Sequence, residues 1–456
     1  MPSWRLVAGI AVLVAACDLK VVNPGPVADA DLNVAAASDA IVFGAMRSFN
    51  DALGTNGGNF SMCGALIARE LYPSGQTGSF ACSFQEMFNT LTPAGASEFD
   101  RGQLARWLAE NAVARIMATR GDSFSTYANA APILLYVGYA NRLLGENLCQ
   151  TVIDGGPLLA FTIHFARAES AFTAALAIAQ AQKNATYTSA AYAGRASVRI
   201  WLKNWSGAAA DAAQVPIGFV YATPYNTIDQ TQSNSIAVAT TDQVRRNFSL
   251  WNTFYGDNFD QFADPRTPYR KFPATPSKVG LGSVPDLGDG LGPVGAVQYY
   301  QQRKYIPDPT TGLSNAPINL SSGHEAQLII AESDLRNGDV AGAMTIVNSL
   351  RTIAGVKLRN TAVTSDSAWT YMKLEKLIEL WLQGRAVGER RRWFGDGPDP
   401  AAPGSLPAHL SMTDRTGKDR CWPISLTEAS TNPHLINVDT LIQGVRRPAS
   451  RPRIKP

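Results

Sequence analysis

Apolar residues recur at three- and four-residue steps in paired segments joined by short polar turns, and this pattern dominates the 456-residue chain. In one such turn, Asn337-Gly338-Asp339, the glycine suits a left-handed backbone and Asp339 suits the N-cap of a second helix. Helices are therefore expected over residues 36–54, 97–119, 123–147, 161–182, 185–202, 206–213, 323–336, 339–353 and 366–394.

The paired segments have short turns and small residues, and each pair spans thirty-odd residues. These features indicate helical hairpins of the tetratricopeptide kind. Residues 215–320 and 395–456 lack this periodicity and are rich in Pro, Gly, Asn and Asp. We therefore expect a mostly α fold, with a helical-hairpin scaffold over residues 36–213 and 322–394 and long irregular insertions that contain short strands. Irregular segments of this length in a compact protein are usually functional or mobile.

The N-terminal residues indicate export. Residues 6–16 form an apolar run that is too short to span a bilayer but typical of a secretory signal. The run ends in Val14-Ala15-Ala16-Cys17, which resembles the lipobox of bacterial lipoproteins, where the cysteine is acylated. We predict a signal peptide over residues 1–16 and one mature domain over 17–456, anchored by lipid on Cys17. The alternative is an ordinary secretory signal that contains a cysteine.

The remaining cysteines fit an oxidising compartment, because lipidation of Cys17 leaves an even number. Cys63 and Cys82 flank a segment rich in Gly and Ser and form the expected local disulfide. Cys149 and Cys421 are then left for a long-range disulfide, and free buried thiols are the alternative. No Cys-x-x-Cys motif or Cys/His cluster occurs in the sequence, so no metal site is predicted.

Catalytic motifs and cofactor motifs are missing from the sequence. His324-Glu325 lacks the second histidine of a zinc protease, and neither a Gly-x-Ser-x-Gly elbow nor a Walker A loop occurs. The glycines of residues 280–295 follow no apolar strand and are interpreted as a flexible loop. Asp257, Asp260 and Asp264 are interpreted as solvated turn residues. We predict no catalytic residues and no cofactor.

The net charge gives no signal for nucleic acid. The formal value is +3, but five basic residues lie within residues 446–456, so the rest of the chain is nearly neutral. A nucleic-acid-binding domain would instead carry a basic surface. We therefore predict no nucleic-acid partner.

An ordered set of motifs resembles the SusD/RagB family, surface lipoproteins that capture nutrients above TonB-dependent outer-membrane transporters. The most specific motif is Leu328-Ile329-Ile330-Ala331-Glu332, which runs into Asn337-Gly338-Asp339. The stretches that carry the resemblance are residues 17–24, 144–149, 168–176, 328–355, 375–385, 391–394 and 423–433. Lys376 and Gln383 depart from the family pattern. The set covers most of the mature chain.

The resemblance implies a non-catalytic, lipid-anchored protein on the surface of the outer membrane. Such a protein forms a lid on a SusC-like TonB-dependent transporter, binds an oligosaccharide or peptide nutrient and delivers it for uptake. Two other functions remain open: a helical-repeat envelope scaffold without a small ligand, and an extracytoplasmic glycan hydrolase. A hydrolase would need a convergent pair of acids, and the sequence nominates none.

Ligand contacts are expected among aromatic residues of the irregular segments, because the apolar faces of sugars stack on aromatic rings. The candidate ligand-binding residues are Tyr72, Phe80, Phe84, Trp251, Asn252, Phe254, Tyr255 and Tyr299. Of these, Tyr299 is a lesser candidate, as is Tyr300, and Asp257 lies near Trp251 in the sequence. Any of these rings can instead hold a long loop against the helices.

Charged residues inside the family motifs are expected to be structural. Glu379 and Arg385 lie among apolar helix positions and should form ion pairs beside the core. Glu332 and Arg351 lie on the two arms of one expected hairpin and could pair with each other. Substitution of these residues should cause misfolding, because a buried charge without its partner is costly.

Overall fold

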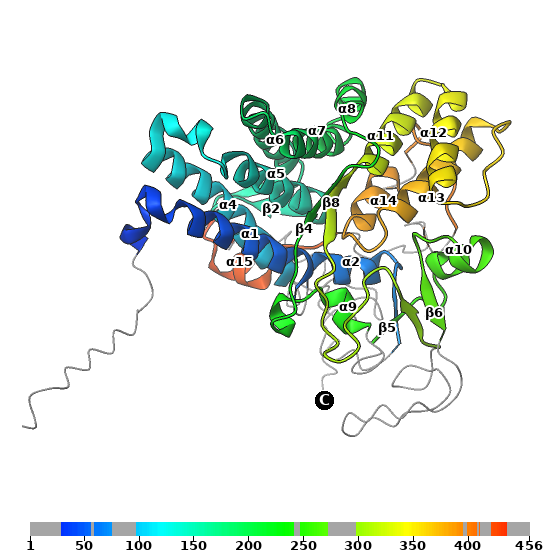
Figure 1. Ribbon diagram of the computed structural model, residues 1–456, viewed down its shortest axis with the longest axis horizontal. Coiled ribbons are helices and arrows are strands. Elements are labelled where there is room, and N and C mark those ends of the chain that lie inside the picture. Colours follow the sequence, from blue (N-terminus) through cyan, green and yellow to red (C-terminus); the bar gives the residue numbers. More distant parts are fainter. Residues whose placement is uncertain are drawn as a thin grey trace, which may run out of the picture.

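The computed structural model describes residues 29–55, 59–74, 97–240, 247–271, 298–394, 399–407, 410 and 421–435. Within these ranges helices dominate and the strands are two to five residues long (Figure 1). The prediction of a mostly α fold is confirmed. None of the described helices combines the length and the hydropathy that a membrane-spanning segment requires.

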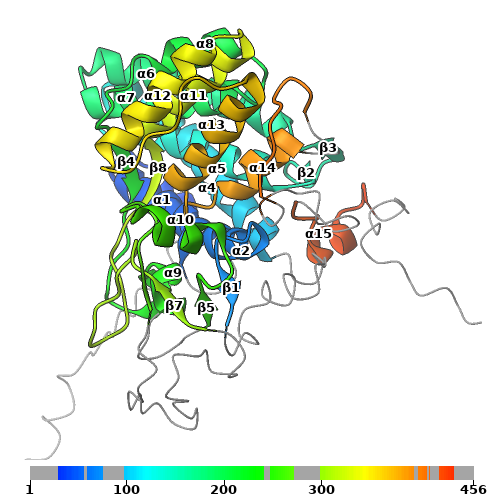
Figure 2. The same cartoon turned by 90° about the vertical axis from the view of Figure 1, so that its right-hand side faces the viewer.

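The scaffold is a row of helices in which successive helices pack on one another, except for the last, which packs on Phe60–Ile67 and Ala130–Asn147. Its first half consists of α1 (Ser38–Gly54), α4 (Ser97–Arg120), α5 (Ala130–Asn147), α6 (Ile163–Ala181), α7 (Ala185–Arg199) and α8 (Trp205–Ala212). Its second half consists of α11 (Gly323–Arg336), α12 (Val340–Ile353), α13 (Ser365–Glu379) and α14 (Ala386–Phe394). The halves join where α11 packs on α7 and α8 (Figure 2).

Small residues allow these helices to approach closely. The ring of Phe172 on α6 is fully buried and lies against Gly138 of α5 and Gly194 of α7. A Cβ atom at Gly138 would lie 2.5 Å from this ring, and one at Gly194 would lie 2.4 Å from it. The side chain of Phe172 therefore fills a space that exists only because both neighbours are glycine.

The turn between α11 and α12 has the predicted form. Gly338 has a φ of 83°, and the Asp339 carboxylate accepts a hydrogen bond from the N–H of Gly342 at 2.8 Å. Gly338 thus supplies the left-handed turn residue and Asp339 the N-cap.

The prediction of one long helix over residues 366–394 is wrong. α13 ends at Glu379 and α14 begins at Ala386, because the chain between them turns through left-handed backbone at Leu382 (φ 58°) and Gly384 (φ 73°). Gly384 adopts this conformation readily, whereas Leu382 needs support from its surroundings. That support comes from contacts with distant segments, described below.

Short strands occur in the insertion over residues 215–320, as predicted, and also within residues 36–213, and the structure has helices that the sequence did not indicate. The strands form antiparallel pairs: β1 (Tyr72–Pro73) with β5 (Phe248–Ser249), β2 (Gln150–Val152) with β3 (Leu158–Ala160), β4 (Val220–Thr223) with β8 (Ile318–Ser322), and β6 (Tyr269–Lys271) with β7 (Tyr300–Gln302). The unexpected helices are α2 (Phe60–Ile67), α9 (Ser235–Ala239), α10 (Phe254–Phe262) and α15 (Leu426–Thr431). Figure 2 shows β1, β5, β7 and α9 at the edge of the scaffold away from α6 to α8, and Figure 1 shows β5 and α9 there.

A disulfide between Cys149 and Cys421 confirms the predicted long-range pair. Beside it, the N–H of Cys149 donates to the carbonyl of Trp422 at 2.9 Å, and the N–H of Trp422 donates to the carbonyl of Asn147 at 2.8 Å. The disulfide and these bonds hold the C-terminal part of the chain against the end of α5. Cys63 is also disulfide-bonded, and its predicted partner Cys82 lies outside the described residues.

Buried ion pairs connect the scaffold helices, as expected for Glu379 and Arg385. Glu379 pairs with Arg266 at 2.7 Å, and Arg385 pairs with Glu146 and Glu325, each at 2.8 Å. The prediction of ion pairs beside the core is confirmed for both residues.

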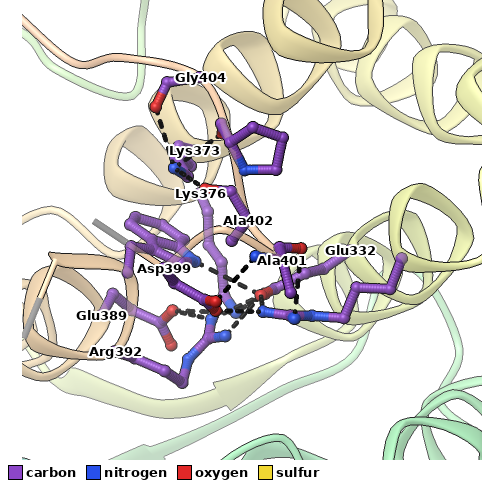
Figure 3. A network of polar contacts seen from close by, with 12 residues as sticks. Glu332, Lys373, Lys376, Glu389, Arg392, Asp399, Ala401, Ala402 and Gly404 are labelled. Carbon is purple, nitrogen blue, oxygen red and sulfur yellow. Dashed lines mark hydrogen bonds and ion pairs between the residues drawn. The ribbon is translucent and has the colours of Figure 1, made fainter. Parts of the chain in front are cut away.

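The suggested pair between Glu332 and Arg351 does not form. Glu332 lies between Lys376 of α13, at 3.3 Å, and Arg392 of α14 (Figure 3). Arg351 instead pairs with Glu375 of α13 at 3.1 Å. Both side chains thus bind helices that the hairpin packs against. Burial alone would raise the pKa of Glu332, but Arg392 and Lys376 outweigh it and hold the pKa below its usual value.

Candidate functional site

Strands from distant parts of the chain bring three aromatic residues together. Tyr72 of β1 pairs with Ser249 of β5, and Leu250, which follows β5, donates its N–H to the carbonyl of Tyr300 in β7 at 2.9 Å. Tyr72, Trp251 and Tyr300 therefore lie on neighbouring stretches of backbone.

The hydroxyl of Ser249 fixes two of these three aromatic residues. Its Oγ accepts the N–H of Trp251 at 3.0 Å and the N–H of Tyr300 at 2.9 Å. The same Oγ donates to the carbonyl of Gln298 at 2.7 Å. The fully buried Ser249 hydroxyl thus joins three backbone groups and sets the backbone positions of Trp251 and Tyr300.

The rings of Tyr72 and Trp251 form the centre of the candidate site. Their centroids lie 5.2 Å apart with an angle of 80° between the planes, and both side chains are only partly buried. Asn252 follows in a left-handed conformation (φ 54°) with its side chain exposed. The pair therefore offers accessible aromatic surface beside an amide that can bond to hydroxyl groups.

Charged residues lie beside Tyr300. Its ring stacks on Tyr269 with a centroid distance of 5.1 Å, and the Lys271 ammonium lies 5.1 Å from the Tyr300 ring centroid. The Asp260 carboxylate accepts a hydrogen bond from the Tyr269 hydroxyl at 2.6 Å and one from Lys271 at 3.3 Å. Burial and the bond to Asp260 raise the pKa of Tyr269 to about 12, so its hydroxyl stays protonated.

Two of the candidate aromatic residues belong to the core. Tyr255 is fully buried and stacks on Trp381 with centroids 5.6 Å apart. Tyr299 is also fully buried, and its hydroxyl donates to the carbonyl of Thr240. A ring without exposed surface has no face for a ligand, so Tyr255 and Tyr299 are removed from the candidate site. Phe254 is partly buried against Tyr255.

Phe80 and Phe84 lie outside the described residues, and so do the glycines of residues 280–295. These candidates stay predictions from the sequence.

The three aspartates of this insertion differ in environment. Asp257 and Asp260 are exposed, in agreement with the interpretation as solvated residues. For Asp264 that interpretation is wrong, because its side chain is fully buried and pairs with Arg266 at 2.8 Å. Arg266 also binds Glu375 of α13 at 2.5 Å, so the end of α10 is fixed to the scaffold.

A buried carboxyl group precedes the strand that carries Tyr72. Glu70, two residues before Tyr72, accepts a hydrogen bond from the N–H of Leu382, while its other oxygen has no hydrogen-bond partner among the described residues. Burial raises the pKa of Glu70 to about 7, even though Lys304 and Arg390 act in the opposite direction. Glu70 thus connects the strand that carries Tyr72 to the break between α13 and α14.

Metal binding finds no support in the part of the chain that the structure describes. There, no group of three or more His, Cys, Asp or Glu side chains is placed to hold a metal ion.

Solved structures share this architecture along nearly their whole length. A SusD-like carbohydrate-binding protein from Bacteroides vulgatus matches with a TM-score of 0.62 and 14% identity, over 88% of this chain and 97% of its own. The chain has the SusD-like fold. A laminarin-binding SusD-like protein matches with a TM-score of 0.62 and 14% identity, over 86% of this chain and 96% of its own.

A SusD/RagB family protein from Bacteroides thetaiotaomicron also shares the SusD-like fold, with a TM-score of 0.59 and 12% identity, over 88% of this chain and 95% of its own. No family model matches the sequence, and no curated protein matches it either. The relationship is therefore visible in the arrangement of the helices and strands rather than in overall sequence similarity.

The sequence indicated some of the site and missed the rest. Tyr72, Trp251 and Asn252 were candidates, whereas Ser249, Tyr269 and Lys271 were not. Nothing in the sequence signals that β6 lies beside β7 or β1 beside β5, because strand pairs this short leave no recognisable pattern.

Proposed function

We propose that the protein is a non-catalytic surface protein that binds an oligosaccharide at the pair Tyr72 and Trp251. The observation that carries the proposal is the position of these rings, which lie 5.2 Å apart and are partly exposed while the backbone around them is fixed. Aromatic rings in such a setting stack on the apolar faces of sugar rings at little entropic cost. Asn252, which follows Trp251 in the chain, supplies an exposed amide, and Asp260 and Lys271 lie beside Tyr300.

Two of the solved structures with the SusD-like fold support a glycan as the ligand, because one is described as carbohydrate-binding and the other as laminarin-binding. The charged clusters of the described residues support a role without catalysis. Glu332, Glu146 and Asp264 each pair with arginine in the core, where they hold helices together.

The proposal extends to anchoring and transport. Acylation at Cys17 would hold the protein at the outer membrane, and a SusC-like TonB-dependent transporter would receive the ligand. Copurification from membranes in mild detergent tests this part: a β-barrel transporter should be recovered with the wild-type protein, and its absence would remove transport from the proposal.

Affinity electrophoresis and calorimetry test the binding site. Laminarin and a panel of other glycans and peptides would be compared on the wild type, Trp251→Ala and Tyr72→Ala, with melting temperatures measured in parallel. Phe43→Ala is the matched control, because this α1 ring is 59% exposed and lies outside the candidate site.

Each site variant should weaken glycan binding at least tenfold, which corresponds to about 1.4 kcal/mol, at an unchanged melting temperature. The control should bind like the wild type. If both site variants bind like the wild type, the ligand site lies elsewhere. If the wild type binds no member of the panel, a helical envelope scaffold without a small ligand replaces the proposal.

A further inference from the structure

An arginine without an acidic partner lies at the end of the molecule where α10, α12 and α13 meet (Figure 1). The guanidinium carbon of Arg359 lies 4.9 Å from the ring centroid of Tyr371 on α13 and 5.3 Å from that of Phe262 on α10. Among the residues that the structure describes, none accepts a hydrogen bond from this guanidinium or forms an ion pair with it. Arg359 is therefore a strong donor that is held between two rings and has no acceptor in the described chain.

The backbone of Arg359 is fixed by one side chain of α12. Oδ1 of Asn348 accepts the N–H of Arg359 at 2.8 Å, and Nδ2 of Asn348 donates to the carbonyl of Arg359 at 3.0 Å. Nε of Arg359 is enclosed by neighbouring atoms, although the residue as a whole is partly exposed. A partner can therefore reach the guanidinium only at its outer nitrogen atoms, and binding would cost little side-chain freedom.

The acid that acts on Arg359 is already engaged by other cations. Glu375 attracts Arg359 electrostatically, but its carboxylate pairs with Arg266 at 2.5 Å and with Arg351 at 3.1 Å. Burial and the like charge of Arg351 lower the pKa of Arg359. The charge of Arg359 is thus held at a cost, which an incoming anion would reduce.

Aliphatic side chains lie on the surface near Arg359. The segment after α12 folds back along that helix, since the Lys357 carbonyl accepts Nε of Arg351 at 2.6 Å. Leu358 in this segment is 53% exposed, and Ile353 in the last turn of α12 is 54% exposed. Arginine and tyrosine are enriched among the residues that dominate protein–protein binding, and exposed aliphatic side chains beside them favour contact with another protein.

We propose that the surface around Arg359 binds a protein segment that presents an aspartate or glutamate next to an aliphatic side chain. The outer nitrogen atoms of Arg359 donate to the carboxylate, whose planar shape matches the guanidinium, and Leu358 contacts the aliphatic neighbour. A glycan fits this surface less well, because the Phe262 ring that it would stack on packs against Arg359 and also against Arg351, at 5.2 Å. The surface shares no residue with the candidate glycan site, and the proposal does not depend on that site.

Calorimetry tests the proposal with the peptide Ala-Leu-Glu-Leu-Ala, titrated in large excess so that weak binding is measured. The same peptide with Gln in place of Glu is the uncharged comparison. Arg359→Gln removes the charged donor, and Leu358→Asp places a carboxylate next to Arg359 at an exposed position that the core does not need. Arg115→Gln is the matched control, because this α4 arginine already has an acidic partner in Asp29.

Wild-type protein should bind the Glu peptide about tenfold more tightly than the Gln peptide, since a hydrogen bond to a charged group is stronger than a neutral one. Arg359→Gln and Leu358→Asp should each weaken binding of the Glu peptide by a factor of about ten, Leu358→Asp at an unchanged melting temperature. Arg115→Gln and Trp251→Ala should bind the Glu peptide like the wild type.

The proposal fails if the Glu peptide does not bind, if the Gln peptide binds equally well, or if either Arg359→Gln or Leu358→Asp binds like the wild type. Polygalacturonate, an acidic glycan, is titrated in the same way. If it binds more tightly than the peptide and loses this affinity in Arg359→Gln, the surface takes an acidic glycan and the proposal is equally overturned.

Discussion

The carboxylate of Glu70 accepts a hydrogen bond from the backbone N–H of Leu382 at 2.8 Å, across 312 positions of the chain. The hydroxyl of Tyr305 donates to the carbonyl of Leu382 at 3.1 Å, and the ammonium of Lys304 donates to the carbonyl of Trp381. These three side chains satisfy backbone groups that a continuous helix would have satisfied itself. They stabilise the break between α13 and α14 and fix Trp381, on which Tyr255 of α10 stacks.

Replacement of Glu70 by Gln should make stability less dependent on pH. The pKa of Glu70 is raised from its usual 4.5 to about 7 by burial, so the folded state holds a proton that the unfolded state has lost in this range. The contribution of Glu70 to the free energy of unfolding therefore falls by about 1.4 kcal/mol per pH unit as pH rises from 4.5 to 7, and is constant above 7.

Glu70→Gln keeps an acceptor for the Leu382 N–H but does not ionise. Relative to the wild type, the variant should gain up to ~3 kcal/mol at about pH 8 and little at about pH 4.5. Urea denaturation at both pH values measures this difference. A gain of equal size at both values would contradict ionisation of Glu70 as the cause.

Replacement of Glu332 by Ala should strongly destabilise the protein. The side chain is fully buried, and its removal leaves Lys376, also fully buried, with one acidic partner fewer. Loss of one partner from a buried ion pair typically costs ~3–5 kcal/mol. Asp29→Ala is the control, since this side chain is 79% exposed in its pair with Arg115. Denaturant unfolding should separate the two variants clearly, and equal stabilities would contradict a structural role for Glu332.

Replacement of Ser249 by Ala should weaken glycan binding although the hydroxyl has no exposed surface. The N–H groups of Trp251 and Tyr300 both lose their acceptor, and an unsatisfied buried donor costs ~1–3 kcal/mol. The backbone should relax and displace the Trp251 ring, so affinity should fall several-fold. Ser430→Ala on α15 is the control, because this serine lies outside the candidate site. Unchanged affinity in Ser249→Ala would show that Ser249 does not position the ring.

Labelled palmitate should enter the protein in cells and disappear in Cys17→Ala, because the lipobox resemblance places the acyl group on that thiol. The mature N-terminus, determined by mass spectrometry, should be Cys17. Label that persists in the variant would exclude Cys17 as the anchor.

The helical hairpins could be predicted because their determinants are local. The periodic apolar positions, the turn at Gly338 and the cap at Asp339 all act within a few residues of the structure they specify. The break after α13 could not be predicted in this way. Its left-handed Leu382 depends on Glu70 and Tyr305, which are close only in the folded chain.

For the candidate site, too, the sequence could not predict which individual residues are exposed. Tyr299 and Tyr300 are adjacent in sequence, yet one is fully buried and the other partly exposed, because successive side chains of extended backbone point to opposite sides. Composition therefore identified the aromatic segments, whereas the strand register decided which rings remain accessible.

The bond between Cys149 and Cys421 closes a covalent ring that contains every helix from α6 to α14. A protease that cuts one peptide bond inside this ring, for instance in the long insertion, leaves the two pieces joined. Such a nicked molecule keeps its full mass until the disulfide is reduced. A single cleavage in the ring therefore neither releases a fragment nor separates the covalently joined ends of the scaffold.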